Sequence, residues 1–213
     1  MIYLGHGASG SAASMQPYVD GLARRGVESA AVQLPRGGAE KAMPVFLQQS
    51  GSGPDIAVGG QSFGGRVASM LATEHPFQGL VVFSYPLHRP GFPEQLRTEH
   101  WPRIRCPVLL LSGESDPFAT LDLLHREVAK LARHELVTYP RAGHGLKGDN
   151  LEDALDRVAA FLRQAARVNT PTWQSRRAGG GRMGSAPRRW TPATADAGGC
   201  APAPASGRAR ARG

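Results

Sequence analysis

Residues 56–68 read IAVGGQSFGGRVA, and this stretch organises the rest of the chain. An apolar run typical of a buried strand ends in glycines, one serine follows, and two more glycines open a run typical of a helix. This is the strand–turn–helix setting in which a Gly-x-Ser-x-Gly pentapeptide exposes a serine hydroxyl on a sharp turn. The glycines leave room for the neighbouring strand and helix to pass close to that turn. The stretch therefore predicts that Ser62 is a nucleophile.

The pentapeptide alone is a weak signal. Glycine fills 27 of 213 positions, so a chain of this composition contains about 0.2 such matches by chance. The prediction therefore depends on whether the rest of the chain supplies the partners that a nucleophilic serine needs.

Strand and helix patterns alternate along the chain. Short apolar runs predict strands at 2–4, 27–34, 56–59, 80–83, 107–111 and 135–139. Apolar residues at helical spacing predict helices at 12–25, 41–49, from the serine turn to 73, 121–131 and 151–166. The alternation predicts an α/β fold with a mostly parallel six-stranded sheet and helices on both faces. In such sheets ligands bind at the carboxyl ends of the strands.

Composition divides the chain into two regions. Residues 1–167 hold 17 Lys and Arg against 16 Asp and Glu, whereas residues 168–213 hold 8 Arg and 1 Asp. In the second region, 31 of 46 residues are Ala, Gly, Arg or Pro. We predict a folded domain at 1–167 and a disordered tail at 168–213. The tail could bind nucleic acid non-specifically through its arginines, or be an extension without function, and no specific nucleic-acid partner is predicted.

Several classes of protein are disfavoured by the remaining patterns. Cys106 and Cys200 fit no metal-ligand or redox spacing, so the sequence predicts no metal and no cofactor. No run has the length of a membrane span, and Met1 leads into an apolar strand without a signal-peptide pattern. We therefore expect a cytoplasmic protein without membrane association. The oligomeric state stays open, because a partner could cover an exposed edge strand.

The best-placed catalytic base is His144. A serine hydroxyl is a poor nucleophile until a base takes its proton. His144 lies in the loop PRAGHG at 140–145, directly after the last predicted strand. A histidine in a loop is often only a polar residue, but flanking glycines would let this one approach the end of the neighbouring strand. We predict that His144 is the base.

The group that orients this histidine is predicted to be Asp116. It follows the fifth predicted strand in the segment SGESDP at 112–117. Glu114 in the same turn and Asp149 are alternatives, and Asp116 could merely stabilise a turn before a proline. The order Ser62, Asp116, His144, each after a different strand, is the order in which such triads occur on α/β sheets.

Two backbone amides are predicted to bind the oxyanion of a tetrahedral intermediate. One is the N–H of Phe63, which directly follows the nucleophile. The other is the N–H of Ala8, in the loop after the first predicted strand. His6 would brace that loop, although its position also makes it an alternative base.

The segment 84–105 is rich in proline and has no clear periodicity. It leaves the fourth predicted strand at the carboxyl edge, where it could wall a pocket. The candidate pocket residues are His6, Tyr85, His88, Arg97, His100 and Trp101. The alternative is that contacts of Arg97 with Glu99 or His100 only pin the loop. Because the segment is too short for a large cap, we expect a shallow site that is open to water and suits small molecules.

Six segments together resemble those of a known family: Gly5-His6-Gly7-Ala8, Gly60-Gln61-Ser62-Phe63-Gly64-Gly65-Arg66, Ser84-Tyr85-Pro86-Leu87-His88, Arg97-Thr98-Glu99-His100, Gly113-Glu114-Ser115-Asp116-Pro117-Phe118 and Gly143-His144. They are similar to those of small bacterial α/β-hydrolases usually labelled dienelactone-hydrolase-like. These are grouped with a non-catalytic-looking subunit of the eukaryotic NSL histone-acetyltransferase complex and its testis-expressed relative. The resemblance covers roughly residues 2–165.

The resemblance implies an esterase-like serine hydrolase that forms an acyl-enzyme, with Ser62, Asp116 and His144 as its triad. Dienelactone hydrolases proper use a cysteine nucleophile, so lactone specificity does not follow. The usual fold has two strands before the one that carries His6, so those first two strands would be missing here. The alternative function is a non-catalytic interaction module of the same fold, which the three intact triad positions disfavour.

Overall fold

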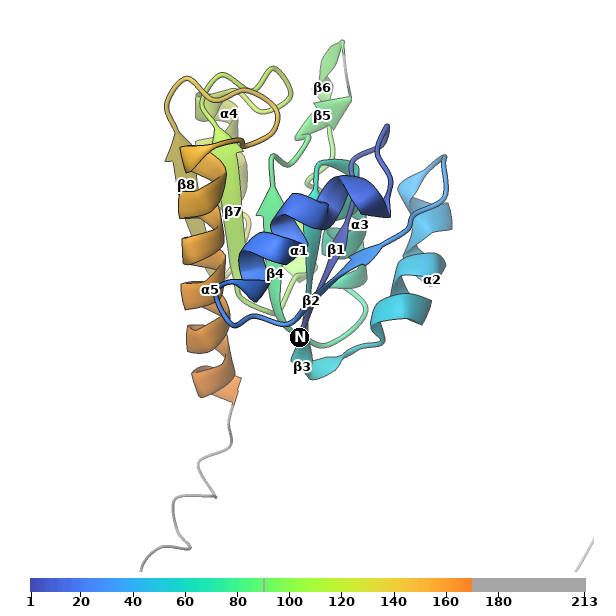
Figure 1. Cartoon of the computed structure of the whole chain (residues 1–213). Coiled ribbons are helices and arrows are strands. Elements are labelled where there is room, and N and C mark those ends of the chain that lie inside the picture. Colours follow the sequence, from blue (N-terminus) through green and yellow to red (C-terminus); the bar gives the residue numbers. More distant parts are fainter. Residues whose placement is uncertain (90, 170–213) are drawn as a thin grey trace, which may run out of the picture. The chain divides into compact units, whose positions relative to one another are not determined.

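The computed structural model describes residues 1–89 and 91–169 (Figure 1). The predicted α/β architecture is confirmed: six parallel strands form one sheet in the order β2-β1-β3-β4-β7-β8. The strands are β1 (Ile2–Gly5), β2 (Ser29–Val32), β3 (Gly53–Gln61), β4 (Phe77–Phe83), β7 (Val108–Gly113) and β8 (His134–Tyr139). The tail predicted at 168–213 lies outside the described residues from position 170 onward.

Helices cover both faces of this sheet. They are α1 (Gln16–Ala23), α2 (Ala39–Ser50), α3 (Phe63–Leu71), α4 (Leu121–Val128) and α5 (Asp149–Asn169), with short 3₁₀ helices η1 (Ala12–Met15) and η2 (Trp101–Arg103). Helices α1 and α5 pack on one face, and α2, α3 and α4 on the other (Figure 1). None of the described helices is long and apolar enough to cross a membrane.

The pleat of the strands creates two hydrophobic cores. Successive side chains of a strand point to opposite faces of the sheet. In β4, Val81 and Phe83 pack with α1 and α5, whereas Leu80 and Val82 pack with the helices of the other face. Both faces of the central strands are therefore buried, which is why these strands read as continuous apolar runs.

The segment after β4 differs from the irregular loop that its sequence predicts. It contains an antiparallel hairpin of β5 (His88–Arg89) and β6 (Phe92–Leu96), which projects beyond the carboxyl end of the sheet (Figure 1). Its strands are short and mostly exposed, so they lack the apolar alternation that identifies a strand. The chain after the hairpin is fixed to α4, because Thr98 Oγ1 donates a hydrogen bond to the buried Glu127.

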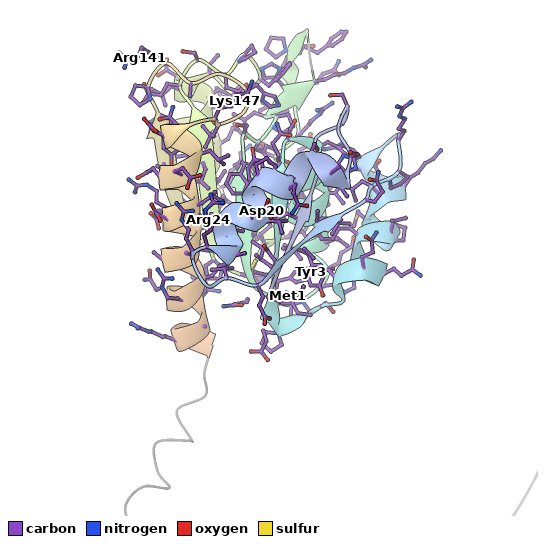
Figure 2. The ribbon with its side chains drawn as sticks, viewed as in Figure 1. Met1, Tyr3, Asp20, Arg24, Arg141 and Lys147 are labelled. Carbon is purple, nitrogen blue, oxygen red and sulfur yellow. The ribbon has the colours of Figure 1, made fainter. Side chains whose placement is uncertain are left out.

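The loops that follow the strands gather at one end of the sheet. Figure 2 shows Arg141 and Lys147, from the loop between β8 and α5, at that end, and Met1 at the opposite one. Residues that follow different strands therefore meet at this edge, as expected for parallel strands.

Candidate active site

Ser62 forms the turn between β3 and α3 by itself, since β3 ends at the preceding residue and α3 begins at the next. Its φ of 51° and ψ of −109° lie in a region that residues other than glycine rarely adopt. The Ser62 N–H donates to the carbonyl of Phe83 at 2.9 Å, and its own carbonyl accepts from the Arg66 N–H at 3.0 Å. The backbone is thus held in a strained turn at the carboxyl end of the sheet.

The glycines around Ser62 allow α3 to approach β1. A Cβ atom on Gly64 would lie 2.1 Å from the carbonyl oxygen of Gly5. Gly60 has a φ of +152°, and a Cβ atom there would lie 2.2 Å from the same oxygen. Because both contacts are with backbone, no side-chain movement could relieve them, and the turn depends on glycine at both positions.

Gly64→Ala is expected to lower the free energy of unfolding by about 1–3 kcal/mol, because the added methyl group overpacks α3 against β1. Urea denaturation monitored by circular dichroism measures this change. Gly143→Ala is the matched control, since the nearest atom to its added Cβ is Ser115 O at 4.0 Å. Equal losses in the two variants would contradict this account of the turn.

The structure brings together the three residues predicted as a triad. His144 Nε2 lies 2.8 Å from Ser62 Oγ, and His144 Nδ1 lies 2.8 Å from Asp116 Oδ2. Asp116 is only 2% exposed, and its Oδ1 also accepts from the Phe118 N–H at 2.9 Å. Since this carboxylate accepts at Nδ1, a neutral ring carries its proton there and presents an unprotonated Nε2 to the Ser62 hydroxyl.

Contacts with residues at the carboxyl ends of β4 and β7 fix the loop that carries His144. The Ser115 N–H donates to the carbonyl of Ala142 at 2.9 Å, and a Cβ on Gly113 would lie 2.2 Å from that oxygen. The Gly145 N–H donates to Ser84 Oγ at 3.1 Å, where Ser84 is fully buried and has a φ of 51°. Sequence reasoning missed this role of Ser84, whose only signal is its place directly after a buried strand.

The two alternative carboxylates have other surroundings. Glu114 Oε1 accepts a hydrogen bond from Thr138 Oγ1 of β8 at 2.9 Å. Asp149 is the first residue of α5. Of the three carboxylates that the sequence offered, Asp116 is the one within hydrogen-bond distance of His144.

The two residues whose amides are predicted to bind an oxyanion both line the cavity in front of Ser62. Phe63 and Ala8 are among the residues that line it. In the part of the chain that the structure describes, neither backbone N–H donates to another protein group. Both amides therefore lack a protein partner among the described residues, as an oxyanion-binding role would require.

His6 braces the loop that carries Ala8. Its ring is 3% exposed, its Nε2 accepts from the Leu34 N–H at 3.0 Å, and its Nδ1 lies 2.7 Å from the carbonyl oxygen of Gly7. Both ring nitrogens are thus engaged with backbone, and His6 is not among the residues that line the cavity.

The cavity has a volume of about 550 Å³. Its lining residues are Gly7, Ala8, Ser9, Gly37, Gly38, Gln61, Ser62, Phe63, Arg66, Pro86, Arg97, Phe118 and His144. Arg97 was predicted from the sequence, and Arg66 was missed. The position of Arg66 four residues after Ser62 could have identified it, because residues at this spacing share a helix face.

The other predicted pocket residues pack behind the residues that line the cavity. The Tyr85 ring meets Trp101 edge-on at 4.9 Å, and its hydroxyl donates to the carbonyl of Arg97 at 2.7 Å. Trp101 is itself buried. His88 is buried as well, with Nδ1 at 3.0 Å from the carbonyl oxygen of Arg89. These side chains support the residues that line the cavity without lining it themselves.

His100 also lies behind the residues that line the cavity, with its Nε2 at 2.8 Å from Ser69 Oγ. Burial, followed by the positive charges of Arg66 and Arg103, lowers the pKa of His100 from 6.5 to about 4. The ring is therefore neutral at pH 7 and adds no charge beside the cavity.

His100 is expected to make the fold sensitive to acid. The folded-state pKa lies below the unfolded value, so unfolding takes up a proton, and the stability that neutral His100 provides is lost as the pH falls from about 6.5 towards 4. Thermal unfolding at pH 7.5 and pH 5 measures this loss, and His100→Gln should reduce the difference between the two melting temperatures. An unchanged difference in the variant would show that other groups cause the acid sensitivity.

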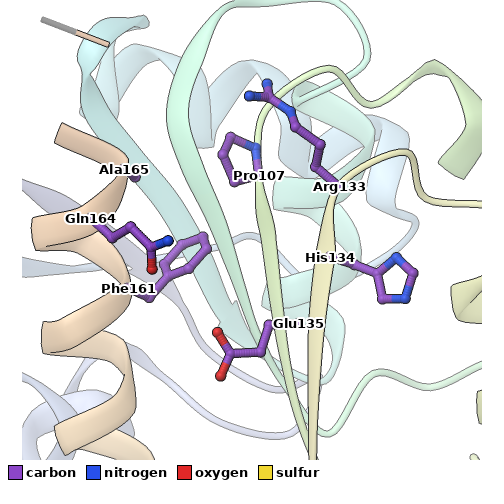
Figure 3. A pocket seen from close by; sticks show the side chains of 7 residues that line it. All are labelled: Pro107, Arg133, His134, Glu135, Phe161, Gln164 and Ala165. Atoms are coloured by element: carbon purple, nitrogen blue, oxygen red, sulfur yellow. The ribbon is translucent and has the colours of Figure 1, made fainter. Parts of the chain in front are cut away.

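A second cavity of about 310 Å³ lies near the starts of β7 and β8, beside α5. Figure 3 shows its lining residues: Pro107, Arg133, His134, Glu135, Phe161, Gln164 and Ala165. Its lining includes none of Ser62, His144 and Asp116. Among residues 1–89 and 91–169, no cluster of three or more His, Cys, Asp or Glu side chains could hold a metal ion.

Comparison with known proteins identifies the family and the folds that this chain resembles. The profile of a family described as "Alpha/beta hydrolase domain" matches residues 38–185. A monoacylglycerol lipase from Paleococcus ferrophilus has a similar structure with 16% identity and a TM-score of 0.65, covering 77% of this chain and 94% of that one. A propionate-bound esterase from Thermogutta terrifontis has 19% identity and a TM-score of 0.61, covering 76% and 82%. At these identities the structural likeness concerns the fold.

Proposed function

The chain belongs to the alpha/beta hydrolase domain family, and from that premise we propose that it is a serine hydrolase that cleaves small esters or related acyl compounds. The observation that carries the proposal is the hydrogen-bonded chain from Ser62 Oγ through His144 to Asp116, with 2.8 Å at each step. A nucleophile, a base and a group that orients the base are the parts that acyl transfer requires.

The proposed reaction has two halves. Ser62 Oγ attacks the ester carbonyl while His144 Nε2 takes the hydroxyl proton, and buried Asp116 stabilises the imidazolium that forms. The amides of Phe63 and Ala8 donate to the oxyanion of the tetrahedral intermediate. His144 then protonates the leaving alcohol, which departs and leaves an acyl-Ser62 ester. In the second half, His144 activates a water molecule that releases the acid and restores the serine.

The cavity supports a small substrate. Its volume of about 550 Å³ is within the range of sites for small molecules. The lipase and the esterase with similar folds act, by their names, on ester bonds, which agrees with the proposed bond type. The motif resemblance to dienelactone-hydrolase-like enzymes supports an acyl substrate as well. Because dienelactone hydrolases proper use a cysteine where this chain has Ser62, the proposal does not extend to lactones.

Release of p-nitrophenol from p-nitrophenyl acetate, butyrate and laurate tests the proposal. Saturable hydrolysis is expected, with acetate and butyrate favoured over the long laurate chain. The matched control is p-nitrophenyl phosphate, which has the same leaving group on phosphorus and should not react. Release at only the buffer rate from all three carboxylic esters would contradict the proposed function.

A further inference from the structure

Two arginines line the cavity in front of Ser62, and no acidic residue does. The lining includes Arg66 and Arg97 but no Asp or Glu among the described residues. The nearby carboxylate of Asp116 is hydrogen-bonded to His144 and to the Phe118 amide. The lining of this cavity therefore carries more positive than negative charge next to the nucleophile.

The Arg66 guanidinium lacks the partners that a half-buried arginine normally has. Its Nε atom is buried and has no hydrogen-bond partner among the described residues. Its one ion-pair contact is Nη2 at 3.7 Å from Glu40, a side chain that is 68% exposed. In contrast, Arg25, whose side chain is 15% exposed, donates four hydrogen bonds to Asp156, Glu152 and Gly21. The hydrogen bonds of Arg25 therefore explain its role in the fold, whereas the contacts of Arg66 do not explain why it is partly buried.

The Arg97 guanidinium has a similar environment. Its backbone is fixed, since its N–H donates to the carbonyl of Leu87 at 2.8 Å and its carbonyl accepts from the Tyr85 hydroxyl at 2.7 Å. Within residues 1–89 and 91–169, no hydrogen bond or ion pair engages the Arg97 side chain. Burial, followed by the positive charges of Arg66 and Arg89, lowers the pKa of Arg97 below its ordinary value. The Arg97 backbone is thus held firmly, and its guanidinium lies within the electrostatic influence of two other arginines.

Grouping cations without an anion between them costs stability, so a folded chain gains from such a pair mainly when a ligand supplies the anion. Guanidinium groups bind carboxylate and phosphate well, because their planar N–H donors match these oxyanions in pairs. We propose that the substrate of this site is an ester that carries a carboxylate or phosphate group, held by Arg66 and Arg97 while Ser62 attacks the carbonyl. This inference rests on the proposed hydrolase function and names its substrate class.

The position of Arg66 suits this role. Arg66 lies one helical turn after Ser62, and its N–H donates to the Ser62 carbonyl at 3.0 Å. Residues at this spacing are roughly 5–6 Å apart at Cβ on the same helix face. The anion and the scissile carbonyl would therefore be separated by only a few bonds, as in the half-ester of a short dicarboxylic acid.

Matched substrates test the proposal with the intact chain. The p-nitrophenyl half-ester of adipic acid carries a free carboxylate, its methyl-capped form is neutral, and a phosphonate analogue of the same length distinguishes the two kinds of oxyanion. A second pair, the acetate esters of 4-hydroxyphenylacetate and of its methyl ester, places the charge on the alcohol half. We expect kcat/KM for the anionic member of at least one series to exceed that of its neutral partner by about 10- to 100-fold, the effect of one charged hydrogen bond.

Arginine variants connect this preference to the two side chains. Arg66→Gln and Arg97→Gln should each lower the ratio of anionic to neutral kcat/KM by about tenfold or more. Arg24→Gln is the matched control, since it removes the same charge from the exposed residue that follows α1 (Figure 2), where Arg24 pairs with Glu152. The ratio should be unchanged in this variant. Melting temperatures of the variants close to that of the wild type would exclude unfolding as the cause of a lower ratio.

The outcomes separate this inference from the proposed function. If the wild type hydrolyses charged and neutral esters equally well in both series, the hydrolase stands and the anionic substrate class is wrong. A preference that survives both pocket variants would also overturn the role of the arginines. If no ester in either series is hydrolysed above the buffer rate, the proposed function itself has failed.

Discussion

Ser62→Ala is expected to lower kcat for p-nitrophenyl butyrate by about 10⁶-fold, the size of loss that follows removal of the serine from a triad. The reason is that Ser62 Oγ is the atom proposed to attack the ester carbonyl. His144 Nε2 lies 2.8 Å from Ser62 Oγ and would have no hydroxyl to activate in the variant. Release of p-nitrophenol at saturating substrate measures the change.

The matched control for this variant is Ser52→Ala, which removes the same hydroxyl from an exposed loop position before the long central strand. It should retain wild-type turnover. Circular dichroism and thermal unfolding should show that Ser62→Ala keeps the fold, since alanine removes only a partly exposed hydroxyl. Substantial turnover in a folded Ser62→Ala protein would show that the ester is cleaved without this serine.

Asp116→Asn is expected to lower kcat by about 10⁴-fold, because an amide at this position can donate to the histidine and favour the wrong ring tautomer. In the wild type, Asp116 Oδ2 accepts from His144 Nδ1 at 2.8 Å, and the residue is buried. The side chains of Asp and Asn have nearly the same shape, so the change tests charge and hydrogen bonding with little disturbance of packing. Steady-state hydrolysis of p-nitrophenyl butyrate is the measurement.

Glu114→Gln is the control that distinguishes the two carboxylates of this turn. Its Oε1 accepts from Thr138 Oγ1 at 2.9 Å, and an amide oxygen can accept the same bond. Turnover within about twofold of the wild type is therefore expected. If Glu114→Gln lost activity while Asp116→Asn kept it, the group that orients His144 would be Glu114 and the geometry proposed for the site would be wrong.

The sheet could be predicted from the sequence because its central strands are buried on both faces. Runs such as 80–83 and 107–111 contain little except apolar residues, and short runs of this kind are typical of strands inside a parallel sheet. The hairpin of β5 and β6 could not be predicted in the same way. Its strands are short and exposed, and their pairing depends on backbone hydrogen bonds that leave no hydrophobic pattern.

The candidate site could be predicted only in part. The order of residues along the chain indicated Ser62, Asp116 and His144, since each follows a different parallel strand. The choice between Asp116 and Glu114 needed three-dimensional information, because it depends on a hydroxyl of the neighbouring strand that engages Glu114. The residues that line the cavity were harder to predict from the sequence than the triad. Whether Arg97 or His100 faces the cavity depends on which way the loop after the hairpin turns, and polar side chains in such a loop give no periodic signal.

Labelling with a fluorophosphonate, followed by mass spectrometry of the intact protein and of its peptides, tests the central claim most directly. The reagent reacts with serines that a neighbouring base activates. One adduct per chain is predicted, located on Ser62 and strongly reduced by Asp116→Asn. The absence of an adduct on the folded wild type, or an adduct on another serine that persists in Ser62→Ala, would contradict the proposed role of Ser62.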